Sequence, residues 1–340
     1  MLLSVPPFAA GPGEQEVERL ICASVVSDNT SVYDQMEQIR DASMRHNPPL
    51  GLHAVLLYQS GWFVYWAEGP GSALRALLER VRRDDRHEAQ RVVHHSRGKR
   101  FLSTPWSMMM SRSHDTPAEF GLRVTAIRQM MEQGRQFAPT SVIRRLSAPM
   151  RLPAARHLPD PEAFHRVGVC GVANEAFDLV AWLGAQQGQP LAHRRFAGEV
   201  DLDSGSDYVE FMQDGHPCRV IAISRHGLLH GLRRAFLPDW PLLLLVMSGQ
   251  PKRDDALMDR VRDACQGLPC CPALLGIAPD TETHARMASR SRSEGLHYLH
   301  GAPIASHDCG AIWHEAREQL KRLGAPASSI WPMTEPLLAA

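Results

Sequence analysis

A proline-containing break near the middle of the chain constrains its fold more than any other feature of the sequence. Residues 148–161 contain four prolines and separate two regions with different patterns of apolar residues. Proline fixes φ and removes a backbone donor, so this composition is typical of a linker. A chain of 340 residues is also too long for one ordinary hydrophobic core. The sequence therefore predicts two domains.

The region before the break predicts elements in the order β-α-β-β-α-β. Apolar runs of strand type cover residues 20–26, 52–58, 62–67 and 91–95, and this arrangement ends near residue 110. Apolar residues at helical spacing cover residues 32–46 and 72–83, then 116–134 and a shorter segment ending at 146. The β-α-β-β-α-β order is that of a ferredoxin-like α+β domain.

The region after the break alternates strands with helices. The expected strands cover residues 167–172, 208–212, 218–223, 242–247, 273–277 and 297–299. One expected helix follows the first strand and ends at residue 187. The other expected helices cover residues 228–235, 254–264 and 307–323. Alternating units of this kind predict a mostly parallel sheet with helices on both faces.

Charge and hydropathy exclude several classes of protein. Lys plus Arg and Asp plus Glu number 37 each, which gives no electrostatic basis for binding nucleic acid or an anionic membrane. The longest apolar run, 241–247, is far below the roughly 20 residues that a bilayer requires. The start of the chain lacks a signal-peptide pattern, and the odd number of cysteines, seven, argues for a reducing compartment. These features predict a cytoplasmic protein without membrane insertion.

Metal and catalytic patterns are absent from the sequence. Cys265, Cys270 and Cys271 lie close together, but no second pair of ligands follows them to complete a zinc site. His314-Glu315 begins like a zincin helix, yet Glu318 stands where the second histidine must fall. The spacing of the histidines and cysteines supplies no nucleophile with its base. We expect neither a metal nor enzymatic activity.

Short stretches in the first region match a known family in the correct order. They are Leu20-Ile21-Cys22-Ala23-Ser24, Arg45-His46-Asn47, residues 63–70 (FVYWAEGP), Asp84-Asp85-Arg86-His87, Lys99-Arg100-Phe101 and Trp106-Ser107-Met108. Through these stretches, residues 18–111 resemble the BLUF (blue light using flavin) sensor domains. The resemblance implies that FAD binds with its flavin between the two helices of the domain and that hydrogen bonds of a Tyr and a Gln switch around it.

The resemblance also implies the residues of the flavin pocket. They are Asn47, Ile39, Cys22, Tyr65, Trp106 and Met108. Cys22 stands at the tyrosine position and Tyr65 at the glutamine position. A thiol is a weak donor, and tyrosine has no amide that can exchange donor for acceptor. The light switch of the family is therefore not expected to operate in its usual form.

Whether FAD binds is a separate question that the sequence leaves open. Asn47 favours binding, although just before two prolines it is equally a helix C-terminal cap. His53 and Ala54 stand where the family has Thr-Gly, and the added Cβ can crowd a flat ligand. Tyr65 and Trp66 add bulk nearby.

The first strand of the second region leads into a degenerate phosphate loop. Such a loop reads G-x-x-x-x-G-K-[ST], in which glycines expose backbone N–H groups, lysine neutralises phosphate and the hydroxyl holds magnesium. The equivalent stretch begins at Gly171 and has Ala176 at the second glycine, Phe177 at the lysine and Asp178 at the hydroxyl. These residues predict that a nucleotide triphosphate is not bound.

Residues 166–323 resemble a Ras-like GTPase in the order of their elements. In this alignment Ser224 replaces the magnesium-linked aspartate, and Asp280 alone remains of the guanine-reading motif. Asp280 is equally an N-cap for the helix that begins at Thr281. Without phosphate, magnesium and base contacts, GTP hydrolysis has no apparatus, so the resemblance implies a pseudo-GTPase.

The expected fold class is α/β, with a ferredoxin-like BLUF domain followed by a mostly parallel, P-loop GTPase-like sandwich. The expected divisions are a leader (1–17), the BLUF-like domain (18–111), a helical extension (112–147), a Pro-rich linker (148–164), the GTPase-like domain (165–325) and a tail (326–340).

Two hypotheses for the function follow. The first is a non-catalytic signalling or scaffolding protein that acts through protein–protein contacts, self-association included, with an unidentified partner and neither GTP nor metal. The alternative is an FAD-binding blue-light photoreceptor whose C-terminal domain is the output. Bound flavin separates the two.

Overall fold

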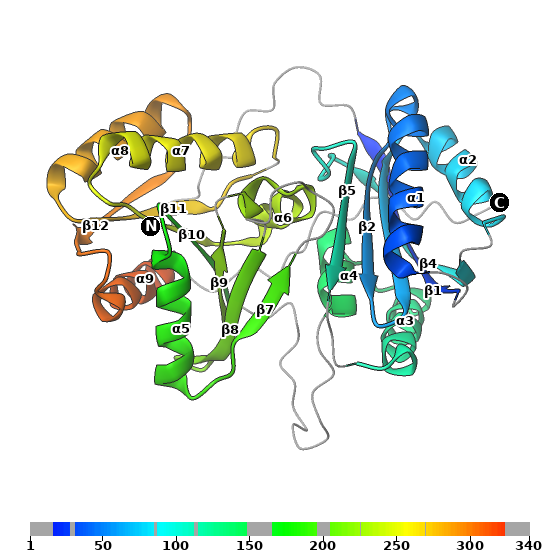
Figure 1. The fold of residues 1–340 in the computed structure, drawn as a ribbon, viewed down its shortest axis with the longest axis horizontal. Coiled ribbons are helices and arrows are strands. Elements are labelled where there is room, and N and C mark those ends of the chain that lie inside the picture. The colour runs from blue at the N-terminus through cyan, green and yellow to red at the C-terminus, as the bar shows by residue number, and fades with distance from the viewer. Residues whose placement is uncertain are drawn as a thin grey trace.

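The computed structural model describes residues 16–27, 31–84, 87–111, 115–147, 165–195, 205–224, 226–268 and 270–323. The predicted linker 148–164, most of the predicted leader and the predicted tail lie outside these ranges. The described residues form two sheets, each covered by helices (Figure 1).

The first sheet has five strands in the order β4-β1-β3-β2-β5. Its elements are β1 (Val17–Val26), α1 (Val32–His46), η1 (Pro48–Leu50), β2 (His53–Gln59), β3 (Trp62–Gly69), α2 (Gly71–Val81), β4 (His87–Gly98) and β5 (Trp106–Ser111). β1 pairs antiparallel with β3 and β4, whereas β5 lies parallel to β2 at the edge. The predicted order β-α-β-β-α-β is confirmed as far as β4, and β5 follows it as a fifth strand.

Local sequence explains where these elements end. α1 ends at Asn47, since Pro48 and Pro49 cannot continue its hydrogen bonds and instead begin η1. The β2–β3 turn places Ser60 at φ 51° and Gly61 at φ 75°, the left-handed region that glycine adopts without strain. The hairpin thus keeps a register in which alternate side chains of β3 face opposite sides of the sheet.

Different helices cover the two faces of the first sheet. α1 and α2 cover one face, where the packed residues include Cys22, Leu74 and Met108. On the other face lie α3 (Pro117–Glu132) and α4 (Pro139–Ser147), which pack on a core that includes Trp62 and Trp66. β5 contributes to both cores, because its side chains alternate between them.

The second sheet has seven strands in the order β12-β11-β10-β6-β9-β8-β7. Its strands are β6 (His165–Gly171), β7 (Ala192–Arg195), β8 (Gly205–Gln213), β9 (His216–Ile223), β10 (Leu242–Val246), β11 (Ala273–Ala278) and β12 (Tyr298–Pro303). The five strands from β12 to β9 are parallel. β8 pairs antiparallel with β9, and β7 pairs antiparallel with β8, so β7 runs in the same direction as the five.

The sheet is therefore mixed, although only β8 runs against the common direction of the other strands, and the sequence prediction gave no residue ranges for two elements of this domain. β7 is four residues long and carries polar side chains, so it has no apolar run. α8 (Thr281–Ser293) has a low apolar content, with buried positions that include polar side chains. Neither segment carries the apolar periodicity on which the prediction depends.

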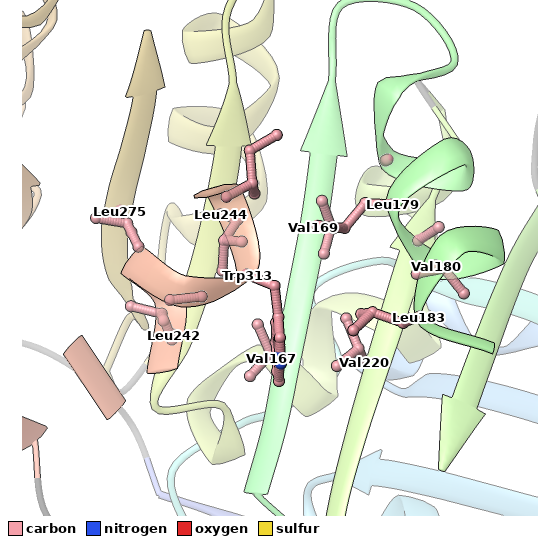
Figure 2. Packing of buried hydrophobic residues seen from close by; sticks show 14 of the residues in the cluster. Val167, Val169, Leu179, Val180, Leu183, Val220, Leu242, Leu244, Leu275 and Trp313 are labelled. Carbon is pink, nitrogen blue, oxygen red and sulfur yellow. The ribbon is translucent and has the colours of Figure 1, made fainter. Parts of the chain in front are cut away.

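Helices cover both faces of the second sheet. Figure 2 shows one core, in which α5 (Glu175–Gln187) and α9 (Cys309–Leu323) pack on β6, with Trp313 close to Val167. α7 (Pro251–Cys265) and α8 pack on the opposite face. Both faces of the central strands are thus apolar, which explains why residues 242–246 are continuously buried.

A short helix of the second domain packs on the first. α6 (Gly231–Phe236) follows η2 (Gly227–Leu229) and precedes η3 (Leu237–Asp239), and it lies beside β5 in Figure 1. Leu232 and Ala235 of α6 join the core under α3 and α4. The buried His230 Nε2 donates to the Met108 carbonyl oxygen at 3.1 Å, and Arg144 of α4 pairs with Asp239. The two sheets therefore share a packed, hydrogen-bonded boundary.

No helix in the described parts of the chain combines the length and the apolar character that crossing a membrane would require.

Candidate functional site

A cavity of about 200 Å³ opens between α1 and α2 on one face of the first sheet. Its lining includes the apolar side chains of Ile39, Leu56, Phe63, Leu77 and Val81. Polar side chains also line the cavity, on the sheet that forms its floor and on the surrounding elements. They are Cys22, Tyr65, Ser43, Arg80, Asp84 and Gln90. The cavity thus combines apolar walls with a few polar side chains, as ligand sites do.

Cys22 projects from β1 onto the floor of this cavity. The side chain is almost fully buried, and burial raises the pKa of its thiol to about 12, so the thiol stays neutral. It forms a hydrogen bond with the Gln90 side chain from the neighbouring strand β4. The floor therefore holds a neutral thiol beside an amide that can both donate and accept.

Tyr65 projects from β3 into the same space. Its hydroxyl accepts a hydrogen bond from Asn47 Nδ2 at 3.2 Å and also bonds with Ser43. Burial raises the pKa of this hydroxyl, so tyrosine remains protonated. Asn47 is the C-cap residue of α1, which confirms that interpretation, and its side chain is held against Tyr65, so its flavin-binding role stays a prediction.

Trp106 and Met108 lie on the same face of the sheet without lining the cavity. The Trp106 ring lies 6.0 Å from the Tyr65 ring, and Met108 packs with Met36 and Phe63. Of the six residues predicted for the flavin pocket, Cys22, Ile39 and Tyr65 line the cavity directly. Asn47 and Trp106 contact Tyr65, and Met108 supports the surrounding core.

Of the expected obstacles to a ligand, Trp66 lies on the other face of the sheet, whereas Ala54 lies on the cavity face in the same cluster as Cys22. Trp66 is buried on the opposite face, where its ring lies 6.2 Å from Phe101, because neighbouring residues of a strand point in opposite directions. The His53 ring donates a hydrogen bond from Nδ1 to the Leu102 carbonyl oxygen at 2.6 Å. Ala54 packs under α2. The prediction that Trp66 adds bulk near the flavin is wrong.

Gln90 and Arg80 are site residues that sequence reasoning missed. Gln90 lies on an edge strand whose pairing with β1 is interrupted by bulges. The alternation of side chains along the sequence therefore does not predict which face of the sheet Gln90 points to. Arg80 belongs to the exposed side of an amphipathic helix, where the sequence predicts only a charged side chain in solvent. Only the tertiary fold, which sets α2 and β4 around the same cavity, brings these two side chains together.

The degenerate phosphate loop of the second domain lies between β6 and α5. Gly171 ends β6, whereas Ala176, Phe177 and Asp178 already belong to the first turns of α5. Glu175 Oε2 accepts from the Ala173 N–H at 2.7 Å. A carboxylate of the chain itself therefore uses a donor at the helix N-terminus, where a bound phosphate would need free N–H groups.

The other nucleotide-related positions have structural partners. Asp280 is the N-cap of α8 and accepts from the Thr283 N–H at 2.7 Å, which confirms the N-cap interpretation. Ser224 Oγ accepts from the Gly205 N–H at 2.9 Å. Within the described ranges, no three His, Cys, Asp or Glu side chains are grouped so as to hold a metal ion.

Comparison with known proteins assigns the first domain. Residues 17–109 match the family model described as sensors of blue-light using FAD, BLUF. The match spans the five strands of the first sheet and the two helices that enclose the cavity. This part of the chain is a BLUF domain, as the resemblance of its sequence motifs predicted. No curated protein matches the chain.

Solved structures similar to the chain include BLUF proteins. The dark-state structure of BlrB, a BLUF protein, is 27% identical, with 36% of this chain and 89% of that one covered and a TM-score of 0.26. The BlrP1 BLUF structure is 22% identical, with 37% and 98% covered and a TM-score of 0.27. Klebsiella pneumoniae BlrP1 in a manganese/cy-diGMP complex at pH 6 is 15% identical over 83% and 74%, with a TM-score of 0.26. These TM-scores are low, so the assignment depends on the family model.

Proposed function

We propose that the first domain binds FAD through the cavity between α1 and α2 and that the chain is a blue-light sensor. The observation that carries this proposal is the cavity itself. A domain that had lost its ligand would be expected to fill the slot with side chains, because protein interiors are close-packed. Here the bulky Trp66 points away from it.

The residues present fit the flavin ring system. At about 200 Å³, the cavity is smaller than the roughly 300–1,000 Å³ of sites that enclose a whole drug-sized ligand. It would therefore take the ring and leave the rest of FAD outside, near the Arg80 cation at its mouth. Two buried polar atoms on this face, Asn47 Oδ1 and Trp106 Nε1, have no hydrogen-bond partner among the described residues. Unpaired buried groups of this kind support a polar ligand edge.

The chain's own residues differ from the switching pair of the family. When bound, FAD supplies the blue-light absorption. Tyr65 and Gln90 then offer a phenol and an amide, but from β3 and β4 rather than from the family positions. Asn47 and Ser43 hold the Tyr65 hydroxyl in place, while Cys22 stays neutral and bonds with Gln90. The expected light response is therefore altered in wavelength shift or lifetime.

The second domain is proposed as a non-catalytic output. Its contact with β5 through His230 and α6 supports this role, because β5 also carries Met108 on the face of the cavity. Its strand order, with one antiparallel strand next to β9, supports a Ras-like arrangement, and the Glu175 contact in the phosphate loop supports a pseudo-GTPase. The seven free cysteines support a reducing compartment such as the cytoplasm.

The test is the flavin content of purified full-length protein. Ala42 lines the cavity yet is exposed, so it lies at the mouth, whereas Ala76 is exposed on α2 away from the cavity. Ala42→Trp should reduce bound flavin by roughly tenfold or more, a loss of about 1.4 kcal/mol or more in binding. Ala76→Trp should leave it unchanged. Absorption spectra and flavin released by heat measure both.

A second candidate is a flavin-free interaction protein. One observation favours it. The Asn47 side-chain amide already donates a hydrogen bond to the Tyr65 hydroxyl, so this donor is used within the chain rather than by a flavin. Colourless wild-type protein that takes up no added FAD would support this candidate and overturn the first.

A further inference from the structure

Two cysteines of the second domain lie in contact at the end of α7. Cys265 is the last residue of this helix and is buried, whereas Cys271 lies half-buried in the loop that leads to β11. The Cys271 thiol donates to the Cys265 carbonyl oxygen at 3.6 Å, and the two thiols also share a hydrogen bond. The loop therefore folds back so that both sulfur atoms meet.

The environments of the two thiols differ in a way that assigns them chemical roles. The hydrogen bond from Cys265 lowers the pKa of Cys271, while the same contact and burial raise the pKa of Cys265. A thiolate is the nucleophile in reactions with peroxides, and its reactivity also requires access to solvent. Cys271 has the more acidic and the more accessible thiol of the two, whereas Cys265 is only 6% exposed.

We propose that Cys271 and Cys265 form an oxidation site for hydrogen peroxide. The Cys271 thiolate attacks one peroxide oxygen, the O–O bond breaks, and Cys271 becomes a sulfenic acid while hydroxide leaves. The Cys265 thiol then attacks that sulfur, the S–O bond breaks, and water leaves as the disulfide forms. In sum, two thiols lose two electrons and two protons to one peroxide, which becomes two waters.

The neighbouring Cys270 provides a matched control. It is the exposed member of the group, and its thiol donates to the Pro238 carbonyl oxygen at 3.5 Å. Burial of its sulfur and the nearby Cys271 raise its pKa to about 11, so it stays a thiol at neutral pH. Exposure alone would predict oxidation at Cys270, whereas the paired geometry predicts it at Cys271.

The site lies beside the helix that contacts the BLUF domain. Arg234 of α6 donates to the carbonyl oxygens of Ala264 and Gln266, at 3.0 Å and 2.7 Å. These carbonyls flank Cys265, so α6 holds the end of α7 on which the thiol pair is built. Oxidation of this cysteine pair does not require flavin, so its test is independent of the proposed light response.

The experiment treats full-length protein with hydrogen peroxide, alkylates the remaining thiols and analyses the tryptic peptide 263–286, which contains all three cysteines. Wild-type and Cys270→Ser proteins should both yield a peptide lighter by two hydrogen atoms and protected from alkylation at two positions. In Cys270→Ser only Cys265 and Cys271 remain in this peptide, so the disulfide is assigned directly. A reductant should restore both thiols.

Two further variants test the order of the steps. Cys265→Ser should stop at the sulfenic acid, which dimedone traps at Cys271. Cys271→Ser, a change at a half-buried position, should leave Cys265 reduced at the same peroxide concentration. Full alkylation of all three cysteines after peroxide, or a disulfide between Cys270 and Cys271, would overturn the proposal.

Discussion

At the residue scale, the cavity of the BLUF domain is decided by a few side chains on its floor. Cys22 and Tyr65 keep the slot open but exchange the chemical groups that the family uses there. Gln90 introduces an amide from an adjacent strand. Binding and switching are therefore separable, because the walls depend on apolar packing and the switch on hydrogen-bonding groups.

The first prediction concerns this separation. Cys22→Tyr combined with Tyr65→Gln restores the family's pair on β1 and β3, with the smaller Gln making room for the larger Tyr. The double variant should give a reversible light-induced red shift of the flavin spectrum that wild-type protein lacks or shows in altered form. Difference spectra before and after blue illumination measure it. Identical difference spectra for both proteins would contradict the assigned roles.

A buried carboxylate carries the second prediction at this scale. Glu68 accepts from the N–H groups of Phe101 and Leu102, at 2.7 Å and 2.9 Å, and from Trp66 Nε1 at 3.1 Å. Burial raises its pKa to about 6 despite these bonds. The folded state therefore binds this proton more tightly than the unfolded state does. The resulting stability is complete below pH 4.5 and is lost as pH rises through 6.

Glu68→Gln should lower the free energy of unfolding by about 2 kcal/mol or more, because one oxygen that accepts two backbone bonds is removed or replaced by a donor. The difference from wild-type should be larger at pH 5 than at pH 8, since only the wild-type gains from protonation at low pH. Urea unfolding at both values measures it. Glu79→Gln, at an exposed position, is the control and should show neither effect.

At the element scale, the strand-to-helix connection at β6 decides what the second domain can bind. Only residues 172–174 separate β6 from α5, and the Glu175 carboxylate already takes the Ala173 N–H. Ala176 is buried under the helix rather than placed in a loop. The connection thus resembles an ordinary helix N-terminus more than a phosphate cradle.

The third prediction follows from this connection. Full-length protein should not bind a fluorescent GTP analogue with magnesium. Glu175→Ala should not restore binding either, because Phe177 still supplies no positive charge. Titration followed by fluorescence anisotropy measures both, and a saturable increase with either protein would contradict the pseudo-GTPase assignment.

Elements with strong apolar periodicity were predictable, and those without it were not. α1, with Met36 and Ile39 at helical spacing, and the apolar strand at 242–246 were predicted from the sequence, as was α7. β7 was missed, and α8 was expected only as a helix that begins at Thr281, since contacts with neighbouring elements stabilise both instead of their own periodicity. The reversed strand of the second sheet, β8, was predicted as a strand, and β7 extends the sheet beyond it.

At the scale of the whole molecule, the two domains meet through β5 and α6. His230 is 2% exposed and donates to the Met108 carbonyl oxygen. Burial lowers the pKa of His230 to about 4, below its ordinary value of 6.5. The unfolded state therefore takes up the proton first. The stability from the neutral ring is complete above pH 6.5 and is lost as pH falls toward 4.

The fourth prediction tests this boundary. His230→Gln keeps a donor for Met108 but removes the titration. Between pH 7.5 and pH 5, wild-type protein should lose about 2 kcal/mol more stability than this variant. Thermal unfolding at the two values measures the difference, with His46→Gln on the exposed end of α1 as the control. Equal losses in the wild-type and the His230→Gln variant would show that the buried ring does not titrate.

The sequence by itself determined the first domain, most strands and helices, and the replacements at Cys22, Tyr65 and Phe177. These follow from local periodicity and from motifs, which are properties of short segments. Tertiary structure alone decided that the cavity stays open, that Trp66 faces away from it, that Gln90 joins Cys22 and that α6 packs on β5. The physical reason is that such contacts join residues far apart in the chain. They form only when the pairing register of the strands decides which face of the sheet each side chain points to.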